Sequence, residues 1–301
     1  MTATAVRRAA GITLGAKRLG LLLLLVFVAC CAWLSVRQGL ADATAEEALQ
    51  DMLTWQAKTI ELAQVRQAYN TMLAAQDLDP SHPTYLHRLG RLSHLMMTLE
   101  PSRRSHWGGL AKEYYRQSLA VRPAWPLTWA NLALVKADLL EFDAEMDQSL
   151  MQAAAYGPYE PGVLELVSSI GLQYEAYLMP NVLATVYGNI ARGLTSPVGR
   201  TARSVFALLE QHSVSAGLIP HLQAVLVATR WNSNADFWFR LALKHWDRWS
   251  DEGLPGLRVK LIEKITENPN RLNLISDVDQ LLYICPYLPR KPKFILVCNR
   301  F

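Results

Sequence analysis

Histidines are the side chains in this sequence that come closest to a catalytic or metal-binding group. The densest cluster is His82, His87, His94 and His106, and the seven-residue spacing of His87 and His94 places them on one face of a helix. A zinc site needs further histidine, cysteine or acidic ligands that converge from elsewhere, and the sequence indicates none. We therefore predict no metal site and no bound cofactor.

Catalytic motifs are missing from the sequence. There is no P-loop, no G-x-S-x-G and no H-E-x-x-H. Trp238, Trp246 and Trp249 share one predicted helix and could stack on sugar rings, but a stripe of this kind more often packs in a core. Asp77 and Asp79 precede Pro80 and are explained by turn chemistry. We predict no catalytic residue and a protein that is not an enzyme.

The four cysteines fall into two pairs. Cys30 and Cys31 lie in an apolar run, and Cys285 and Cys298 lie near the C-terminus. No C-x-x-C pair is present, which argues against structural zinc. Cys285 and Cys298 could form a disulfide if the body is extracytoplasmic. The alternative is that both are free, buried cysteines.

The N-terminal region predicts a membrane anchor. Residues 19–36 form an uncharged apolar run, LGLLLLLVFVACCAWLSV, that would span about 27 Å as a helix. Residues 1–18 carry four bases and no acid, so the positive-inside rule places them in the cytoplasm and the body across the membrane. The remaining residues are neutral overall, which is untypical of a nucleic-acid-binding domain.

Two alternatives to a single-pass anchor remain open. Ala41-Asp42-Ala43 could supply the small residues of a signal-peptide cleavage site, although the apolar run is long for a signal. Phe27-Val28-Ala29-Cys30 resembles a weak lipoprotein signal that would end in a lipidated Cys30. All three place the body outside the cytoplasm. In a bacterium, the anchor would lie in the inner membrane and the body in the periplasm.

The body, from residue 43 onward, predicts helix after helix. Thr44-x-x-Glu47 resembles a capping box that would start a helix. Neither Gly nor Pro occurs in the segment AEEALQDMLTWQAKTIELAQVRQAYNTMLAAQ, residues 45–76. The segment predicts either one long helix that continues out of the membrane or a tight pair of helices.

A repeat is visible in three places. A small residue, a large residue, a second small residue and a proline stand at offsets 0, 4, 7 and 12. The three sets end at Pro80, at Pro123 and, more loosely, at Pro158. Six residues after each proline begins a second pattern: Leu86-x-x-Leu89-Gly90, Trp129-x-x-Leu132-Ala133 and Leu164-x-x-Val167-Ser168. This is the tetratricopeptide (TPR) pattern, in which large residues lock helices together and small ones let helix axes approach. Between the first two repeats, Pro123 closes one helical hairpin and Pro126 opens the next. The sequence therefore predicts an all-α fold, a TPR-like α-solenoid behind one transmembrane helix.

The repeat is uneven. Pro80 to Pro123 is 43 residues and Pro123 to Pro158 is 35, and the first interval is about nine residues longer than a 34-residue unit. We assign the excess to an inserted loop at residues 98–109, TLEPSRRSHWGG, which is either a contact loop or a solvated loop with one packed tryptophan. Past residue 170 the pattern fades. We predict TPR-like repeats over 43–170 and a degenerate helical continuation or cap over 171–301, which ends in an apolar run at 294–298.

A TPR array binds its ligand in the concave groove lined by the first helix of each repeat. From the phase of the repeat, one repeat places polar and partly cationic side chains on this inner face, and the next repeat places mostly apolar ones there. The predicted groove residues are Thr84, His87, Arg91 and His94, followed by Leu127, Ala130, Leu134 and Asp138. A peptide or an acidic ligand could use both sets, although His87 and Arg91 could also be merely solvated.

The body also resembles the VpsP-type family of polysaccharide biosynthesis proteins. The resemblance rests on YYRQSLAVRPAWPLTWANLALVKADLLEFDAEMDQSL, on AAAYGPYEPGV and weakly on LLYICPYLPR, and extends over most of residues 45–290. It implies an accessory factor of bacterial exopolysaccharide operons, and no motif in it is catalytic. Similar TPR segments occur in O-antigen ligase partners, pilus assembly lipoproteins and secretion factors.

These observations favour a non-enzymatic scaffold that binds other protein subunits of an exopolysaccharide synthesis or export complex. One alternative is an adaptor for another envelope machine, such as secretion or pilus assembly. Another is an enzyme that acts on polysaccharide, with carboxylates that the sequence does not pair.

Overall fold

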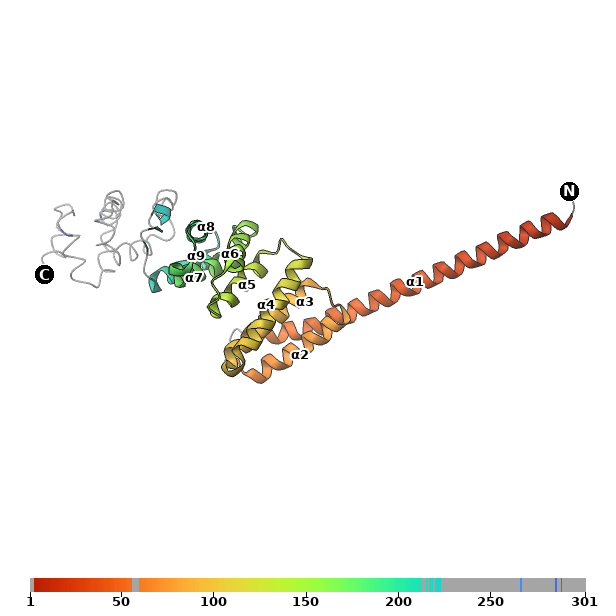
Figure 1. The fold of residues 1–301 in the computed structure, drawn as a ribbon, viewed down its shortest axis with the longest axis horizontal. Helices are drawn as coiled ribbons and strands as arrows, with labels where there is room; N and C mark the ends of the chain where they lie inside the picture. The colour runs from red at the N-terminus through yellow and green to blue at the C-terminus, as the bar shows by residue number, and fades with distance from the viewer. Residues whose placement is uncertain are drawn as a thin grey trace. The chain divides into compact units, whose positions relative to one another are not determined.

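The computed structural model describes residues 3–55 and 60–212, together with positions 215, 217–218, 220–222, 266, 285 and 288. Every labelled element within these residues is helical, as predicted (Figure 1). The α-helices are α1 (Ala3–Thr54), α2 (Leu62–Leu78), α3 (Pro83–Leu99), α4 (Arg104–Val121), α5 (Pro126–Asp138), α6 (Ala144–Tyr156), α7 (Pro161–Gln173), α8 (Pro180–Leu194) and α9 (Gly199–Gln211). Two 3-10 turns, η2 (Pro101–Arg103) and η3 (Glu175–Tyr177), join α3 to α4 and α7 to α8.

The chain divides into two compact units, Met1–Ala124 and Trp125–Phe301. This division cuts through the predicted repeat region, between its first and second matches. The predicted cap over 171–301 stays a prediction, because most residues beyond 222 lie outside those described. The same holds for the tryptophan stripe at Trp238, Trp246 and Trp249 and for the apolar run at 294–298.

Helix α1 is continuous from the apolar segment into the first unit (Figure 1). Its C-terminal part buries a stripe at spacings of four and three residues, which is the spacing of a helix-packing seam. The stripe consists of Ala41, Ala45, Ala48, Met52 and Trp55. Helix α1 ends at Thr54, and α2 begins at Leu62 and packs against this part of α1. Residues 45–76 therefore form the predicted helical pair and not one long helix.

The predicted capping box at Thr44 is wrong. Thr44 lies inside α1, and its hydroxyl donates to the carbonyl oxygen of Leu40 at 2.8 Å. A threonine hydroxyl can bond one turn back in a helix interior as readily as it can cap a helix start. Two further contacts fix α1 to the unit: Arg37 donates to the carbonyl oxygen of Asp77 at 3.4 Å, and the Tyr85 hydroxyl donates to the Asp42 carboxylate.

Prolines begin four of the described helices, as the sequence predicts for Pro126. Pro83, Pro126, Pro161 and Pro180 each occupy the first turn, where the missing N–H removes no helical hydrogen bond. The fixed φ of proline also favours the helical conformation at this position. These residues set the starts of α3, α5, α7 and α8, and hence the phase of the repeat.

The predicted contact loop at residues 98–109 is wrong. Helix α3 continues to Leu99 and α4 begins at Arg104, with only Glu100 and the turn η2 between them. Helices α3 and α4 have 17 and 18 residues, whereas α5 and α6 have 13 each. The extra length of the repeat therefore lies in longer helices.

Small residues allow close packing of the helices in both units. A Cβ at Gly90 would lie 2.6 Å from the ring of Tyr115, so glycine lets α4 approach α3 in the first unit. In the second unit, a Cβ at Gly171 or Gly193 would collide with a valine of the next helix, at 2.0 and 2.8 Å respectively. These contacts are the physical basis of the small positions in the repeat.

Candidate protein-binding surfaces

The predicted groove residues of α3 differ in their exposure. Arg91 is exposed, whereas Thr84 and His94 are partly buried. The side chain of His87 is only 4% exposed, and its ring lies 5.6 Å from that of Tyr115. The expectation that His87 faces a ligand is therefore corrected, because α4 packs over that side of α3.

Burial changes the chemistry of His87. Desolvation, followed by the positive charges of Arg91 and Arg88, lowers the pKa of His87 from 6.5 to about 3. The ring is therefore neutral at physiological pH, and it belongs to the interior of the first unit. Arg91 and His94 remain as the polar groups on which α3 could bind a partner.

The predicted groove residues of α5 lie mostly against neighbouring helices. Ala130 is fully buried, and Leu134 packs against the core of the second unit. Leu127 packs against Gly162 near the start of α7, where an added Cβ would lie 3.1 Å from it. Asp138 is partly buried at the end of α5. Leu127, Leu134 and Asp138 therefore leave only part of their surface for a ligand.

A buried lysine holds the link between α5 and α6. The side chain of Lys136 is 2% exposed, and its Nζ lies 2.8 Å from both Asp143 and Glu145 and 3.4 Å from Glu141. Although desolvation opposes it, the bonds to Asp143 and Glu145 raise the pKa of Lys136 above its ordinary value. Asp143 also caps α6, since its carboxylate accepts the N–H of Met146 at 3.0 Å.

The sequence analysis missed this charge cluster. A possible signal was a lysine inside the apolar stretch LALVKADLL with four acids within the next nine residues. A charged residue in such a stretch is rarely buried without partners.

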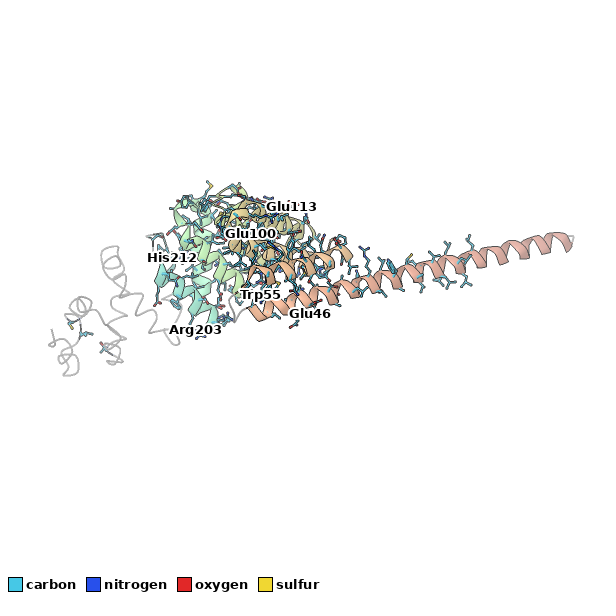
Figure 2. All side chains as sticks on the ribbon, turned by 90° about the horizontal axis from the view of Figure 1, so that it is seen from below. Glu46, Trp55, Glu100, Glu113, Arg203 and His212 are labelled. Carbon is cyan, nitrogen blue, oxygen red and sulfur yellow. The ribbon has the colours of Figure 1, made fainter. Side chains whose placement is uncertain are left out.

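The corner between α3 and α4 is held by Glu100, which is labelled in Figure 2. Its carboxylate accepts the indole N–H of Trp107 at 2.7 Å and lies 3.6 Å from a guanidinium nitrogen of Arg66. The guanidinium of Arg103 lies 4.9 Å from the centre of the Trp107 ring. Arg103 and His106 are exposed here, whereas Trp107 packs inside. The corner is therefore a structural joint with an exposed cationic rim.

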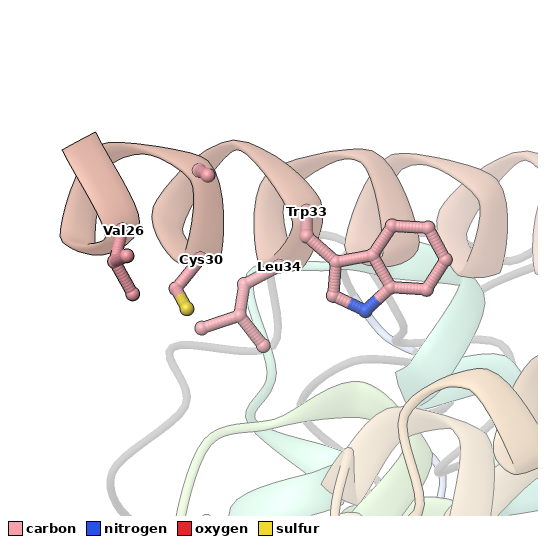
Figure 3. Close-up of a pocket in the computed structure, with 5 residues that line it drawn as sticks. Val26, Cys30, Trp33 and Leu34 are labelled. Carbon is pink, nitrogen blue, oxygen red and sulfur yellow. The ribbon is translucent and has the colours of Figure 1, made fainter. Parts of the chain in front are cut away.

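The apolar part of α1 exposes its side chains. Among the described residues, one helical stretch, Leu19–Gln50, is long and apolar enough to cross a membrane, and its most apolar 18 residues have a mean hydropathy of 2.7. Figure 3 shows a shallow hollow lined by Val26, Ala29, Cys30, Trp33 and Leu34, all from α1. A hollow built from one apolar helix offers only the Trp33 indole N–H and the Cys30 thiol to orient a ligand, and we assign it no site.

Neither a metal site nor a reactive cysteine cluster is found among the described residues. Among the described residues, no group of three or more histidine, cysteine or acidic side chains could hold a metal ion. Cys30 and Cys31 are free and exposed. Cys285 is disulfide-bonded, but Cys298 lies outside the described residues, so the Cys285–Cys298 pairing stays a prediction.

Comparisons with known proteins find likenesses among solved structures alone. No protein-family model and no curated protein matches the chain. Among solved structures, the chain is similar to PilF of Pseudomonas aeruginosa, with 18% sequence identity and a TM-score of 0.43. The match covers 79% of this chain and 97% of that chain. A superposition this loose carries no inference about function, and the TPR-like architecture rests on the helix packing described above.

Proposed function

We propose that this protein is a non-enzymatic scaffold of the bacterial inner membrane that binds subunits of an exopolysaccharide synthesis or export complex. Residues 19–36 hold it in the membrane, and its TPR-like helices lie in the periplasm and bind other proteins. The observation that carries the proposal is the unbroken helix α1, which joins an apolar span directly to packed helical hairpins. The polysaccharide setting comes from the resemblance to VpsP-type proteins.

The partner surface of the first unit includes the exposed side of α3. Arg91 and His94 supply polar and cationic groups there, and Thr84 lies two turns before Arg91 on the same side. His87 and Ala130 take no part, because each is buried. In the second unit, the partly exposed side chains of Leu127, Leu134 and Asp138 on α5 offer a separate surface.

Crosslinking in intact membranes, followed by purification of the tagged chain, tests the proposal. The wild type is compared with the double variant Arg91→Ala/His94→Ala and with Arg116→Ala, a control at an exposed arginine of α4. We expect the wild type and the control to capture glycosyltransferase or chain-length-control subunits, and the double variant to capture fewer. Capture of secretion or pilus subunits instead would favour the alternative envelope adaptor.

Topology needs a separate measurement. Alkaline phosphatase and green fluorescent protein are fused in turn to the C-terminus of the full chain. We expect an active phosphatase and no fluorescence, because the phosphatase matures only outside the cytoplasm. Fluorescence without phosphatase activity would refute the periplasmic placement.

A further inference from the structure

One segment of the second unit is strongly acidic. The 55 residues 137–191 contain eight aspartates or glutamates and no lysine, arginine or histidine. They form the end of α5, the whole of α6 and α7, and most of α8. Lys136, just before the segment, pairs with three of these acids, Glu141, Asp143 and Glu145. Because the full chain has a net charge of +4, this excess of acid is a local feature.

Apolar side chains are exposed where two links between these helices meet. The α5–α6 link and the α7–α8 link meet there, since the ring of Phe142 stacks on that of Tyr177 at 4.6 Å and 10°. Tyr177 is 65% exposed, and Leu140 and Met179, from the same two links, are 67% and 58% exposed. We call Leu140, Phe142, Tyr177 and Met179 the aromatic end. Large apolar groups that gather on a surface mark interaction sites more often than scattered ones.

Leu140 has a backbone conformation that leucine rarely adopts. Its φ is +60°, and within the described residues it is the only residue other than glycine with a positive φ. Its N–H donates to Ala137, and the N–H of Glu141 donates to Lys136, both at 2.9 Å, which together make a Schellman ending of α5. Glycine usually occupies this position because a side chain is strained there. Stability alone explains neither the strain nor the exposure of a leucine here.

The aromatic end is also held in place. Lys136 bonds to carboxylates at both ends of the α5–α6 link, at Glu141 and at Asp143 and Glu145. On the other link, the Tyr187 hydroxyl donates to the Glu175 carboxylate, which ties η3 to α8. A surface fixed before binding loses less conformational entropy when a partner docks.

We propose that the aromatic end binds a segment of a partner protein whose apolar side chains are flanked by lysines or arginines. The exposed leucine, tyrosine and methionine take the apolar side chains. The partly exposed carboxylates of the α5–α6 link, Glu141 and Asp143, attract the bases. The inference rests on the proposed scaffold function and names a second-unit surface for it. It does not depend on the α3 surface.

A binding titration with a defined peptide tests the proposal. The full chain is reconstituted in nanodiscs of zwitterionic lipid, and empty nanodiscs correct for binding to lipid. The probe is a fluorescent synthetic peptide of about 12 residues, with phenylalanine and leucine at its centre and lysines on both sides. A matched peptide carries glutamates in place of the lysines.

The variants are Leu140→Gly and Tyr177→Ser, and the control is Tyr159→Ser. Tyr159 is 74% exposed and lies in the α6–α7 link, at the opposite end of these helices. We expect each test variant to raise the Kd of the lysine peptide by about tenfold, as for loss of an interface anchor. The control should leave it unchanged, and added salt should weaken binding. Leu140→Gly also relieves the left-handed strain, so a loss of binding cannot be attributed to misfolding.

Three results would overturn the proposal. The first is equal binding of the lysine peptide by the wild type and by both test variants. The second is equally tight binding of the glutamate peptide. The third is self-association of the wild type that the test variants abolish, because the surface would then seat a second copy. If crosslinking captures partner subunits but the peptide does not bind, the aromatic end is rejected and the scaffold function stands. If the peptide binds but crosslinking captures no partner subunit, the scaffold function is rejected and the aromatic end stands.

Discussion

Gly90 provides a sharp test of the close helix packing in the first unit. A glycine-to-alanine change inside an exposed helix normally stabilises a protein by about 0.5–1 kcal/mol. At Gly90 the added Cβ would lie 2.6, 2.7 and 2.9 Å from three ring atoms of Tyr115, which is fully buried and has no free space to move into. Overpacking of this kind costs about 1–3 kcal/mol. We therefore expect Gly90→Ala to lower the free energy of unfolding by about 1–2 kcal/mol.

Gly109→Ala is the matched control, because Gly109 lies in α4 and a Cβ there would meet nothing within 4 Å. We expect this variant to gain about 0.5–1 kcal/mol, the opposite sign. The assay is urea unfolding of the full chain in detergent micelles, followed by far-UV circular dichroism. In a Tyr115→Leu background the cost of Gly90→Ala should shrink, because the ring that it strikes is gone. A Gly90→Ala protein as stable as Gly109→Ala would refute the close approach of α3 and α4.

Three more predictions follow from buried or strained groups. In the folded state the pKa of His87 is lowered to about 3. Its contribution to the free energy of unfolding should therefore be complete above pH 6.5, and the free energy of unfolding should fall by about 1.4 kcal/mol per pH unit below that. His87→Gln should remove this slope from urea midpoints measured between pH 7.5 and 4.5. Leu140→Gly should raise the free energy of unfolding by about 1 kcal/mol, while Leu140→Ala should not, in the same unfolding assay. Lys136→Met should lower the free energy of unfolding by about 1–3 kcal/mol. The loss is smaller than for a fully buried ion pair because water partly hydrates the carboxylates. It should also raise the pKa of Asp143, as measured by NMR titration, because Lys136 holds that pKa below its usual value.

Local sequence signals predicted the start of α5 and the close contact at Gly90. A proline in the first turn and a small residue at a fixed distance from it act within a few residues, so the sequence alone is sufficient to place Pro126 and Gly90. The capping box predicted at Thr44 was wrong because the same hydroxyl can cap a helix or bond inside one. The insertion at 98–109 failed because an excess of residues fits equally well into a loop or into two longer helices.

The surface residues were harder to predict than the helices. A helix-face assignment places His87 beside Arg91, but whether it is exposed depends on the ring of Tyr115, 28 positions along the chain. The Lys136 cluster and the aromatic end also needed the structure. Each depends on how a link folds back, as in the left-handed Leu140 or the Phe142–Tyr177 stack. Such contacts between links leave no periodic trace in the sequence.

The continuity of α1 matters for how a scaffold of this kind would work. A flexible linker would let the body sample many orientations above a membrane, and each partner would have to overcome that entropy on binding. Here the helix that carries the apolar segment also supplies the buried seam from Ala41 to Trp55, and Arg37 and Asp42 bond to α2 and α3 just beyond the apolar run. The first unit therefore cannot turn independently of α1. If α1 spans the membrane as we propose, Arg91 and His94 keep a fixed direction relative to it, which favours partners that are themselves embedded in the same membrane.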